Sequence, residues 1–346
     1  MRLQPLSLAL FALAGTCAAP AAHAQSNVTL YGIVDMYMQV GKGDKTTTQL
    51  QSGGMSGSRW GLKGAEDLGG GLKAVFVLES GVNADTGTLG SGGGLFSRQS
   101  YVGLSSASAG NLLFGRQRVP HYDAIGAADP FDQGAGSASS SGIVSGSTRV
   151  DNAVVWQSPK WGGFSVNSMA ALGESTTGGT RNADVYSIAA QYASGPALVG
   201  LAWRQSNKPT DADFNANHAL LTAVYDFGAF KLMGGVQHVN NFAGQSWNDR
   251  NEAYFGARIP VFAADQVWLG MGGVKVHEQS GRSATQWSAG YDHPLSKRTD
   301  LYGVATRIRN GSLATYTATA ATGAGPIVTA GGVNVNALQL GIRHRF

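Results

Sequence analysis

The chain of 346 residues is poor in cysteine and in charge, and each shortage excludes a class of protein. Its single cysteine, Cys17, lies within the first 24 residues, so the rest of the chain offers no disulfide framework and no thiolate metal site. Charged residues make up only 13%, and a formal net charge of +4 is too small by itself to indicate a nucleic-acid partner. The histidines are scattered without metal-ligand spacing, so neither a metal nor a cofactor is predicted.

Long apolar runs and helical periodicity are scarce as well. Beyond the N-terminal segment, no stretch approaches the ~20 apolar residues of a membrane-spanning helix. Glycine, by contrast, is abundant, with 50 residues and no collagen period, while hydrophobic residues at 43% argue against disorder. Many short strands joined by tight turns explain this composition best.

The first 24 residues have the pattern of a secretory signal peptide. A positive start at Arg2 precedes the apolar stretch LSLALFALAG, and the small residues AHA end the segment at Ala24. The stretch is too short and wrongly flanked for a spanning helix. We therefore expect export and a mature domain over 25–346. A lipoprotein anchor at Cys17 is the alternative, although the residues before this cysteine fit that pattern poorly.

Alternation with a period of two recurs along the chain and indicates strands with one apolar and one polar face. In VTLYGIVDMYMQV (28–40), apolar residues share one side while Tyr31, Asp35 and Gln39 lie on the other. In YGVATRIR (302–309), aromatic and aliphatic residues alternate with glycine and two arginines. If such strands span a bilayer, the apolar face is expected to lie against lipid and the polar face against water.

The connections between these strands alternate in length. Short links such as EDLGGG, SPKWGG, ASGP and DFGA take turns with longer polar ones, for example 41–57 and 310–334. Short turns at one end and long loops at the other are typical of an outer-membrane barrel, and we count about sixteen strands of spanning length. The predicted fold is therefore all-β, a 16-stranded antiparallel transmembrane β-barrel. A soluble sandwich, which also alternates, is the alternative.

The last residues, GIRHRF, continue the alternation to the very end of the chain. Hydrocarbon contains no water, so every backbone donor and acceptor must be paired within the sheet and an open edge is not tolerated. The last strand is therefore expected to pair with the first. Phe346 would then lie in the aromatic belt at the periplasmic interface.

Charged residues recur at mid-strand, where an arginine facing lipid would cost roughly 2–4 kcal/mol. We therefore expect Arg59, Lys63, Glu79 and Arg98 to line the lumen. Arg116 and Arg118, which close the fifth strand, and Arg149, which opens the sixth, are expected to line it as well. The connection 119–148 is too long for a structureless loop in a compact domain, but a wide barrel gives it room to fold inward. Its first half carries three aspartates expected to face the cationic wall across a narrow water path: Asp123, Asp129 and Asp132.

Several stretches resemble the trimeric general porins of beta-proteobacterial outer membranes, of the Neisseria and Burkholderia type. In the family's order these are VTLYGIVD, SRWGLKGAEDLGGGLKAVFVLESG, FSRQSYVGLSS, LFGRQ, RVDNAVVWQSPKWGGFS, GYDHPLSKRTDLYG and GIRHRF. The resemblance implies a homotrimer in the outer membrane of a Gram-negative bacterium. It also implies a passive aqueous channel for ions and small hydrophilic solutes, narrowed by the third external loop, 119–148. Lipopolysaccharide and outer-membrane lipid would surround it, and the assembly machinery would read Phe346.

The resemblance also implies roles for single residues. The constriction arginines would be Arg59, Arg98 and Arg149, with Glu79 and an aspartate of the loop opposite. Val155 stands where family members often carry a basic residue. The expected mechanism is electrostatic filtering with a weak preference for anions, without a catalytic residue; the alternative is that these charges only pair with each other. A barrel hydrolase and a non-conducting adhesin or anchor remain as alternative functions.

Overall fold

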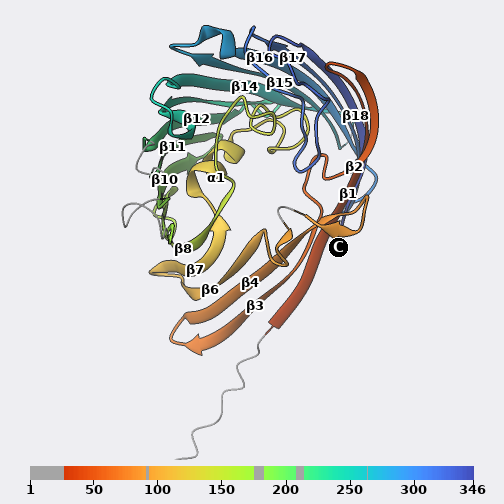
Figure 1. Ribbon diagram of the computed structural model, residues 1–346. Coiled ribbons are helices and arrows are strands. Elements are labelled where there is room, and N and C mark those ends of the chain that lie inside the picture. Colours follow the sequence, from red (N-terminus) through yellow and green to blue (C-terminus); the bar gives the residue numbers. More distant parts are fainter. Residues whose placement is uncertain (1–26, 91–92, 175–182, 208–213, 263) are drawn as a thin grey trace, which may run out of the picture.

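A computed structural model describes the chain over residues 27–90, 93–174, 183–207, 214–262 and 264–346. The expected signal peptide, 1–24, lies outside these residues. The described part forms one antiparallel sheet that curls into a ring, with an inner loop and a short helix inside it (Figure 1). None of the helices in this part of the chain is long and apolar enough to cross a bilayer.

The wall is made of strands that follow one another around the ring in chain order. The first half contains β1 (Asn27–Lys42), β2 (Thr46–Ser52), β3 (Arg59–Gly69), β4 (Leu72–Asn83), β5 (Thr88–Leu89), β6 (Gln99–Ser106), β7 (Gly110–Arg118), β8 (Arg149–Gln157) and β9 (Phe164–Ala171). The second half contains β10 (Val185–Ser194), β11 (Ala197–Ser206), β12 (Ala216–Asp226), β13 (Lys231–Asn240), β14 (Arg250–Val261), β15 (Asp265–Val276), β16 (Ala284–Pro294), β17 (Thr299–Asn310) and β18 (Val335–Arg345). The helices are α1 (Pro120–Ala127), η2 (Phe242–Gly244) and η3 (Ser280–Arg282).

The labels β2 and β3 belong to one strand of the wall. The second half of β1 pairs with β2 and its first half pairs with β3, so β2 and β3 form a single interrupted strand. The two-residue β5 pairs only with the end of β4. The wall therefore has sixteen spanning strands, which confirms the predicted fold. The loop expected at 41–57 is corrected, because β2 lies within it and only the segment 53–58 leaves the wall.

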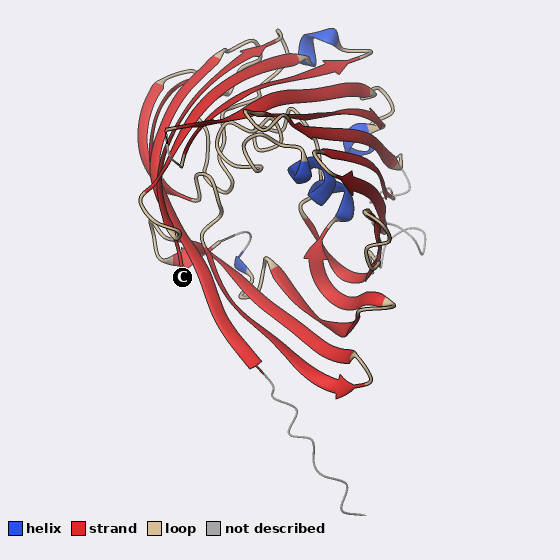
Figure 2. Cartoon of the chain, turned by 180° about the vertical axis from the view of Figure 1, so that it is seen from behind, coloured by secondary structure: helices blue, strands red, loops and turns tan. Residues whose placement is uncertain are grey.

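The seam between the chain ends is closed. β1 and β18 pair over ten positions, from Ile33 opposite Arg345 to Lys42 opposite Asn336. Beyond β18, Phe346 and Gly32 exchange two backbone hydrogen bonds of 3.1 Å. Figure 2 shows this seam from behind, with the C-terminus at the edge of the closed wall. The prediction that the last strand pairs with the first is confirmed, and the Phe346 ring remains about half exposed on the outer side.

Strand alternation sorts side chains between the two faces as predicted for β1 and β18. On β1, Val28 and Leu30 are exposed to the outside, whereas Asp35 and Gln39 are fully buried inside. The outer face is therefore an apolar band, as a barrel in lipid requires. Short turns such as 195–196 alternate with long loops at the opposite end of the barrel, and this alternation defines the periplasmic and extracellular ends.

β17 departs from this rule. Its apolar residues Val304 and Ile308 point inward and are buried, whereas Arg307 and Arg309 are exposed on the outer face near the extracellular end. The Arg309 guanidinium lies 5.3 Å from the ring centre of Trp287. The expectation that the apolar side of this strand faces lipid is wrong. The reason is tertiary: Phe131 of the inner loop packs beside Val304, so the lumen side of β17 is a protein core.

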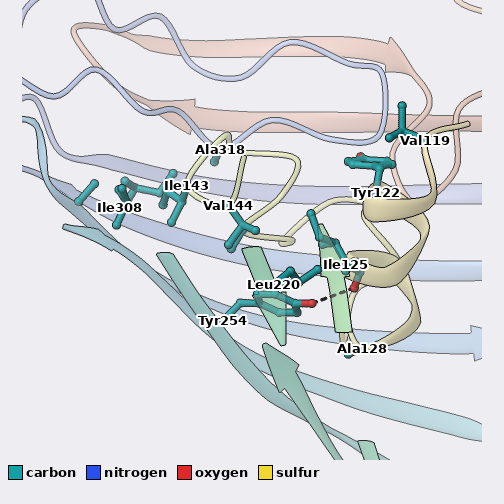
Figure 3. Close-up of a cluster of buried hydrophobic side chains, with 14 of the residues drawn as sticks. Val119, Tyr122, Ile125, Ala128, Ile143, Val144, Leu220, Tyr254, Ile308 and Ala318 are labelled. Atoms are coloured by element: carbon teal, nitrogen blue, oxygen red, sulfur yellow. Dashed lines mark hydrogen bonds between the residues drawn. The ribbon is translucent and has the colours of Figure 1, made fainter. Parts of the chain in front are cut away.

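The connection 119–148, called here loop 3, fills part of the lumen. Its apolar residues pack against the inner faces of β12, β14 and β17, with Ile125 and Val144 fully buried (Figure 3). The Tyr254 hydroxyl donates a hydrogen bond of 3.0 Å to the Ile125 carbonyl. The predicted inward course of loop 3 therefore holds in the structure.

A second connection, 311–334, also folds inward, which was not predicted from the sequence. The Ala321 amide donates to the Gly54 carbonyl at 3.0 Å, and Thr319 donates through its hydroxyl to the Ser140 carbonyl of loop 3. Ala318 is fully buried. This loop thus links loop 3 to the segment 53–58 across the extracellular side of the lumen.

Candidate functional site

The charged residues meet because five consecutive wall positions present them at the same height. Register places Glu79 of β4 opposite Gly61 of β3 and Gln99 of β6, so the adjacent Arg98 lies beside it. Arg118 ends β7 directly opposite Arg149, which begins β8. The group formed by Arg59, Glu79, Arg98, Arg118 and Arg149 is called here the arginine cluster. All five residues were predicted from the sequence to line the lumen.

Glu79 and Arg98 form the buried centre of the arginine cluster. The Arg98 Nε lies 2.8 Å from Glu79 Oε1. Glu79 is only 3% exposed and Arg98 only 4%. The Tyr31 hydroxyl donates a second hydrogen bond of 3.1 Å to the same carboxylate. Because each charge is satisfied by the other, this pair contributes little net field to the lumen.

The other three arginines leave a positive excess. The Arg59 Nε donates to the Gly57 carbonyl at 2.9 Å, and Arg118 pairs with Asp123 of α1. The Arg149 Nε is buried without a hydrogen-bond partner in the part of the chain that the structure describes, and Arg98 and Arg118 repel its charge. Four guanidiniums therefore face two carboxylates, those of Glu79 and Asp123.

Lys63 and Arg116 lie apart from the cluster. Lys63 of β3 is on the lumen side, with its ammonium 5.3 Å from the ring centre of Tyr31. Arg116 is opposite Ser100, on the same face as the exposed Val102, so it points to the outside of the barrel. There Arg116 pairs at 2.7 Å with Asp151. The prediction that Arg116 lines the pore is corrected, and its charge avoids the cost of facing lipid alone because Asp151 lies beside it.

The three loop aspartates have different surroundings. Asp123 and Asp132 are partly exposed and pair with wall arginines, Asp132 at 2.7 Å with Arg258 of β14. Asp129 is buried inside loop 3, where it accepts hydrogen bonds from the amides of Phe131 at 2.8 Å and of Gln133 at 3.1 Å, and from a serine hydroxyl. Burial raises the pKa of Asp129. The expectation that Asp129 faces the water path is corrected, because its carboxylate holds the turn of the loop.

The wall beneath loop 3 holds polar residues that were not predicted from the sequence. The Arg258 Nε donates to the Pro130 carbonyl at 2.8 Å, and His121 Nε2 lies 2.5 Å from Gln237 Oε1. The argument that kept arginines out of lipid would have found Arg258, because it too lies at mid-strand. No sequence pattern indicated His121, because its partner Gln237 is 116 residues away in the chain. Within the described residues, no three histidine, aspartate or glutamate side chains are grouped to hold a metal.

Comparison with known proteins agrees with this architecture. The family model for Gram-negative porins matches residues 9–313. The chain is 34% identical to outer membrane porin protein 32 of Delftia acidovorans, over 97% of this chain and 99% of that protein. It is 31% identical to an outer membrane porin protein of Bordetella pertussis, over 95% of this chain and 96% of that protein.

Solved structures show the same barrel. An anion-selective porin from Comamonas acidovorans matches with a TM-score of 0.80 and 30% identity, over 93% of this chain and 100% of that chain. OmpT of Vibrio cholerae in its trimer form matches with a TM-score of 0.69, over 93% of this chain and 99% of that chain. Because the two sequences are only 15% identical, this match shows only the fold. The closed barrel, the inward loop 3 and these similarities show that the chain belongs to the Gram-negative porin family, as a beta-proteobacterial porin of the outer membrane.

Proposed function

We propose that this porin is a general diffusion channel for ions and small hydrophilic solutes with a weak preference for anions, and that the arginine cluster sets this preference. The observation that carries the proposal is the imbalance of charge, since Arg59 and Arg149 form no ion pair with a carboxylate of the described residues. Low-dielectric walls focus the field of such groups into a pore, so a few guanidiniums bias which ion passes. The similar porin from Comamonas acidovorans is described as anion-selective, which supports a preference for anions here as well.

Loop 3 contributes the opposite side of the filter. Its helix α1 brings Asp123 to Arg118, and its tip brings Asp132 to Arg258. Partly exposed carboxylates on the loop and guanidiniums on the wall create a transverse field that would orient dipolar solutes. Added salt should weaken this field, because the Debye length is about 8 Å at physiological ionic strength.

The assembly proposed for this channel is a homotrimer. The support is the family and the trimer form described for OmpT of Vibrio cholerae. Contacts with lipopolysaccharide, and recognition of Phe346 by the assembly machinery, remain predictions. The two alternative functions make opposite predictions: a barrel hydrolase would cleave lipid or peptide, and an adhesin would show almost no conductance.

Planar-bilayer recording tests the channel and its selectivity together. Under a KCl gradient, the reversal potential of the wild-type protein is expected to show weak anion preference, and single trimers should close in three equal steps. Arg149→Glu should move the reversal potential toward cation preference, because it replaces an unpaired positive charge with a negative one among three arginines. Arg149 is a better target than Arg98, where a glutamate would meet the buried Glu79.

The matched control is Arg298→Glu, which makes the same change of charge on an exposed periplasmic turn. It is expected to leave the reversal potential nearly unchanged. A clear cation preference of the wild-type protein would refute the proposed selectivity, and equal shifts in the two variants would refute the role of the arginine cluster.

A further inference from the structure

A second arginine on the lumen side is left without a hydrogen bond. Arg204 of β11 is only 8% exposed, and its Nε is buried without a hydrogen-bond partner among the described residues. A guanidinium carries five N–H donors in a planar fork. A buried charge without a partner is strongly unfavourable, so such groups are found paired with an opposite charge or hydrogen-bonded.

A cavity of about 270 Å³ lies beside Arg204. One side is the returning half of loop 3 and the other is the barrel wall, and the polar lining consists of Arg204, His218, Ser139, Ser145 and Ser147. The Ser139 hydroxyl is also buried without a partner among the described residues. At about 30 Å³ for each water molecule, the cavity has room for several waters or one small anion.

The charges around the cavity do not balance. Glu252 attracts Arg204, but its carboxylate is already 2.8 Å from Arg250 Nε, and both residues of that pair are buried. Burial and the charge of Arg204 lower the pKa of the nearby His121 to about 3, so this imidazole is neutral at pH 7. Among the described residues around the cavity, two guanidiniums therefore lie near one carboxylate, and one positive charge has no counter-ion there.

We propose that this cavity is a binding site for a small oxyanion, such as phosphate, sulfate or the carboxylate of a small solute. The planar fork of Arg204 matches two oxygens of such a group, and the Ser139 hydroxyl supplies a further donor. The site lies between β11, β12 and loop 3, on a different wall from the arginine cluster. It makes a saturable anion site in the lumen, and its existence does not depend on the proposed ion preference of the pore.

Isothermal titration of the purified, detergent-solubilised protein tests the site. Potassium phosphate, sulfate and acetate are titrated separately at constant ionic strength, with chloride as the background ion. We expect saturable binding of at least one oxyanion, weakened about tenfold or more in Arg204→Met. The control Arg298→Met removes the same charge from an exposed turn and should bind as the wild-type protein does.

The three anions separate the possible ligands. Binding of phosphate or sulfate without acetate assigns an inorganic oxyanion, and binding of acetate assigns the carboxylate of a solute. Arg204→Lys keeps the charge without the fork and should bind with intermediate affinity. Ser139→Ala changes a half-buried loop position and tests the site independently of Arg204. We expect it to lower the affinity for the oxyanion severalfold, and this result can be obtained even if Arg204→Met fails to fold.

Two results overturn the proposal. One is wild-type protein that binds none of the three anions while its channels conduct normally. The other is equal binding by the wild-type protein and by folded Arg204→Met or Ser139→Ala. Neither result would affect the reversal-potential test of the arginine cluster, so the two proposals fail separately.

Discussion

The wall formed by β3, β4, β7 and β8 and the wall formed by β14–β17 have the same antiparallel alternation but opposite interiors. On the first, inward arginines stand beside the water path and keep a positive excess. On the second, the inward residues Tyr254, Trp268 and Val304 are buried under loop 3. The difference teaches that the inner face of a barrel can carry large apolar side chains where a loop covers it.

Close approach of loop 3 side chains to the backbone of the sheet makes the covered wall possible. A Cβ on Gly256 of β14 would lie 2.5 Å from the Pro130 ring of loop 3, and one on Gly272 would lie 2.5 Å from the Ala138 side chain. Glycine at both positions lets the loop lie directly on the sheet. The loop then buries its own apolar residues and removes this wall from water.

The largest expected effect comes from Phe131→Ala, which takes away the anchor of loop 3 on the covered wall. Phe131 is fully buried, with its ring centre 6.0 Å from that of Trp268. Truncation of a buried phenylalanine typically costs about 3–5 kcal/mol. A lower thermal midpoint and a larger single-channel conductance are expected, measured against Phe227→Ala at an exposed position in the short turn between β12 and β13. Unchanged conductance in Phe131→Ala would show that other contacts hold the loop.

A smaller effect is expected from acid, which would charge His121 of loop 3 where it contacts Gln237 of β13. Folding lowers the pKa of His121 from 6.5 to about 3, because the imidazole is buried near Arg204 and beside His218. Between pH 6.5 and about 3, the His121 imidazole binds a proton in the unfolded state but not in the folded state. Stability should therefore fall as the pH drops from 6.5 toward 3, by at most about 1.4 kcal/mol per pH unit.

Equilibrium unfolding at several pH values measures this slope. His121→Gln keeps a polar side chain for Gln237 and should flatten the slope. The same slope in both proteins would contradict the assignment to His121. Because Arg204 faces His121, phosphate is kept out of the buffers in this experiment.

The smallest effect is expected from Asp132→Asn, which unpairs Arg258 at the edge of the covered wall. The Asp132 side chain is 58% exposed, and exposed ion pairs contribute about 0–1 kcal/mol, so stability should hardly change. One negative charge fewer beside the water path should slightly strengthen anion preference, measured as a reversal potential under a KCl gradient. A shift toward cation preference would contradict the place given to Asp132 in the filter.

Much of the fold followed from local pattern and from the chemistry of lipid. Period-two alternation that continues to the chain end, and short and long connections in turn, predicted sixteen strands closed by β1 and β18. The same reasoning found the arginine cluster, because Arg59 and Arg149 occur in strands whose alternate residues are apolar. Arg116 was misplaced, although alternation with the exposed Leu112 and Phe114 of its own strand put it on the outside.

The sequence alone determined the closed sheet, the outer apolar band and most of the charges inside, because these depend on neighbours along one strand and on the cost of exposing polar groups to lipid. Only the tertiary structure decided that β17 turns its apolar side inward, that Asp129 is buried, and that Arg204 stands unpaired at a cavity. Those outcomes depend on where loop 3 and the loop 311–334 come to rest, and their partners lie a hundred residues or more away in the chain. Local periodicity carries no information about such contacts.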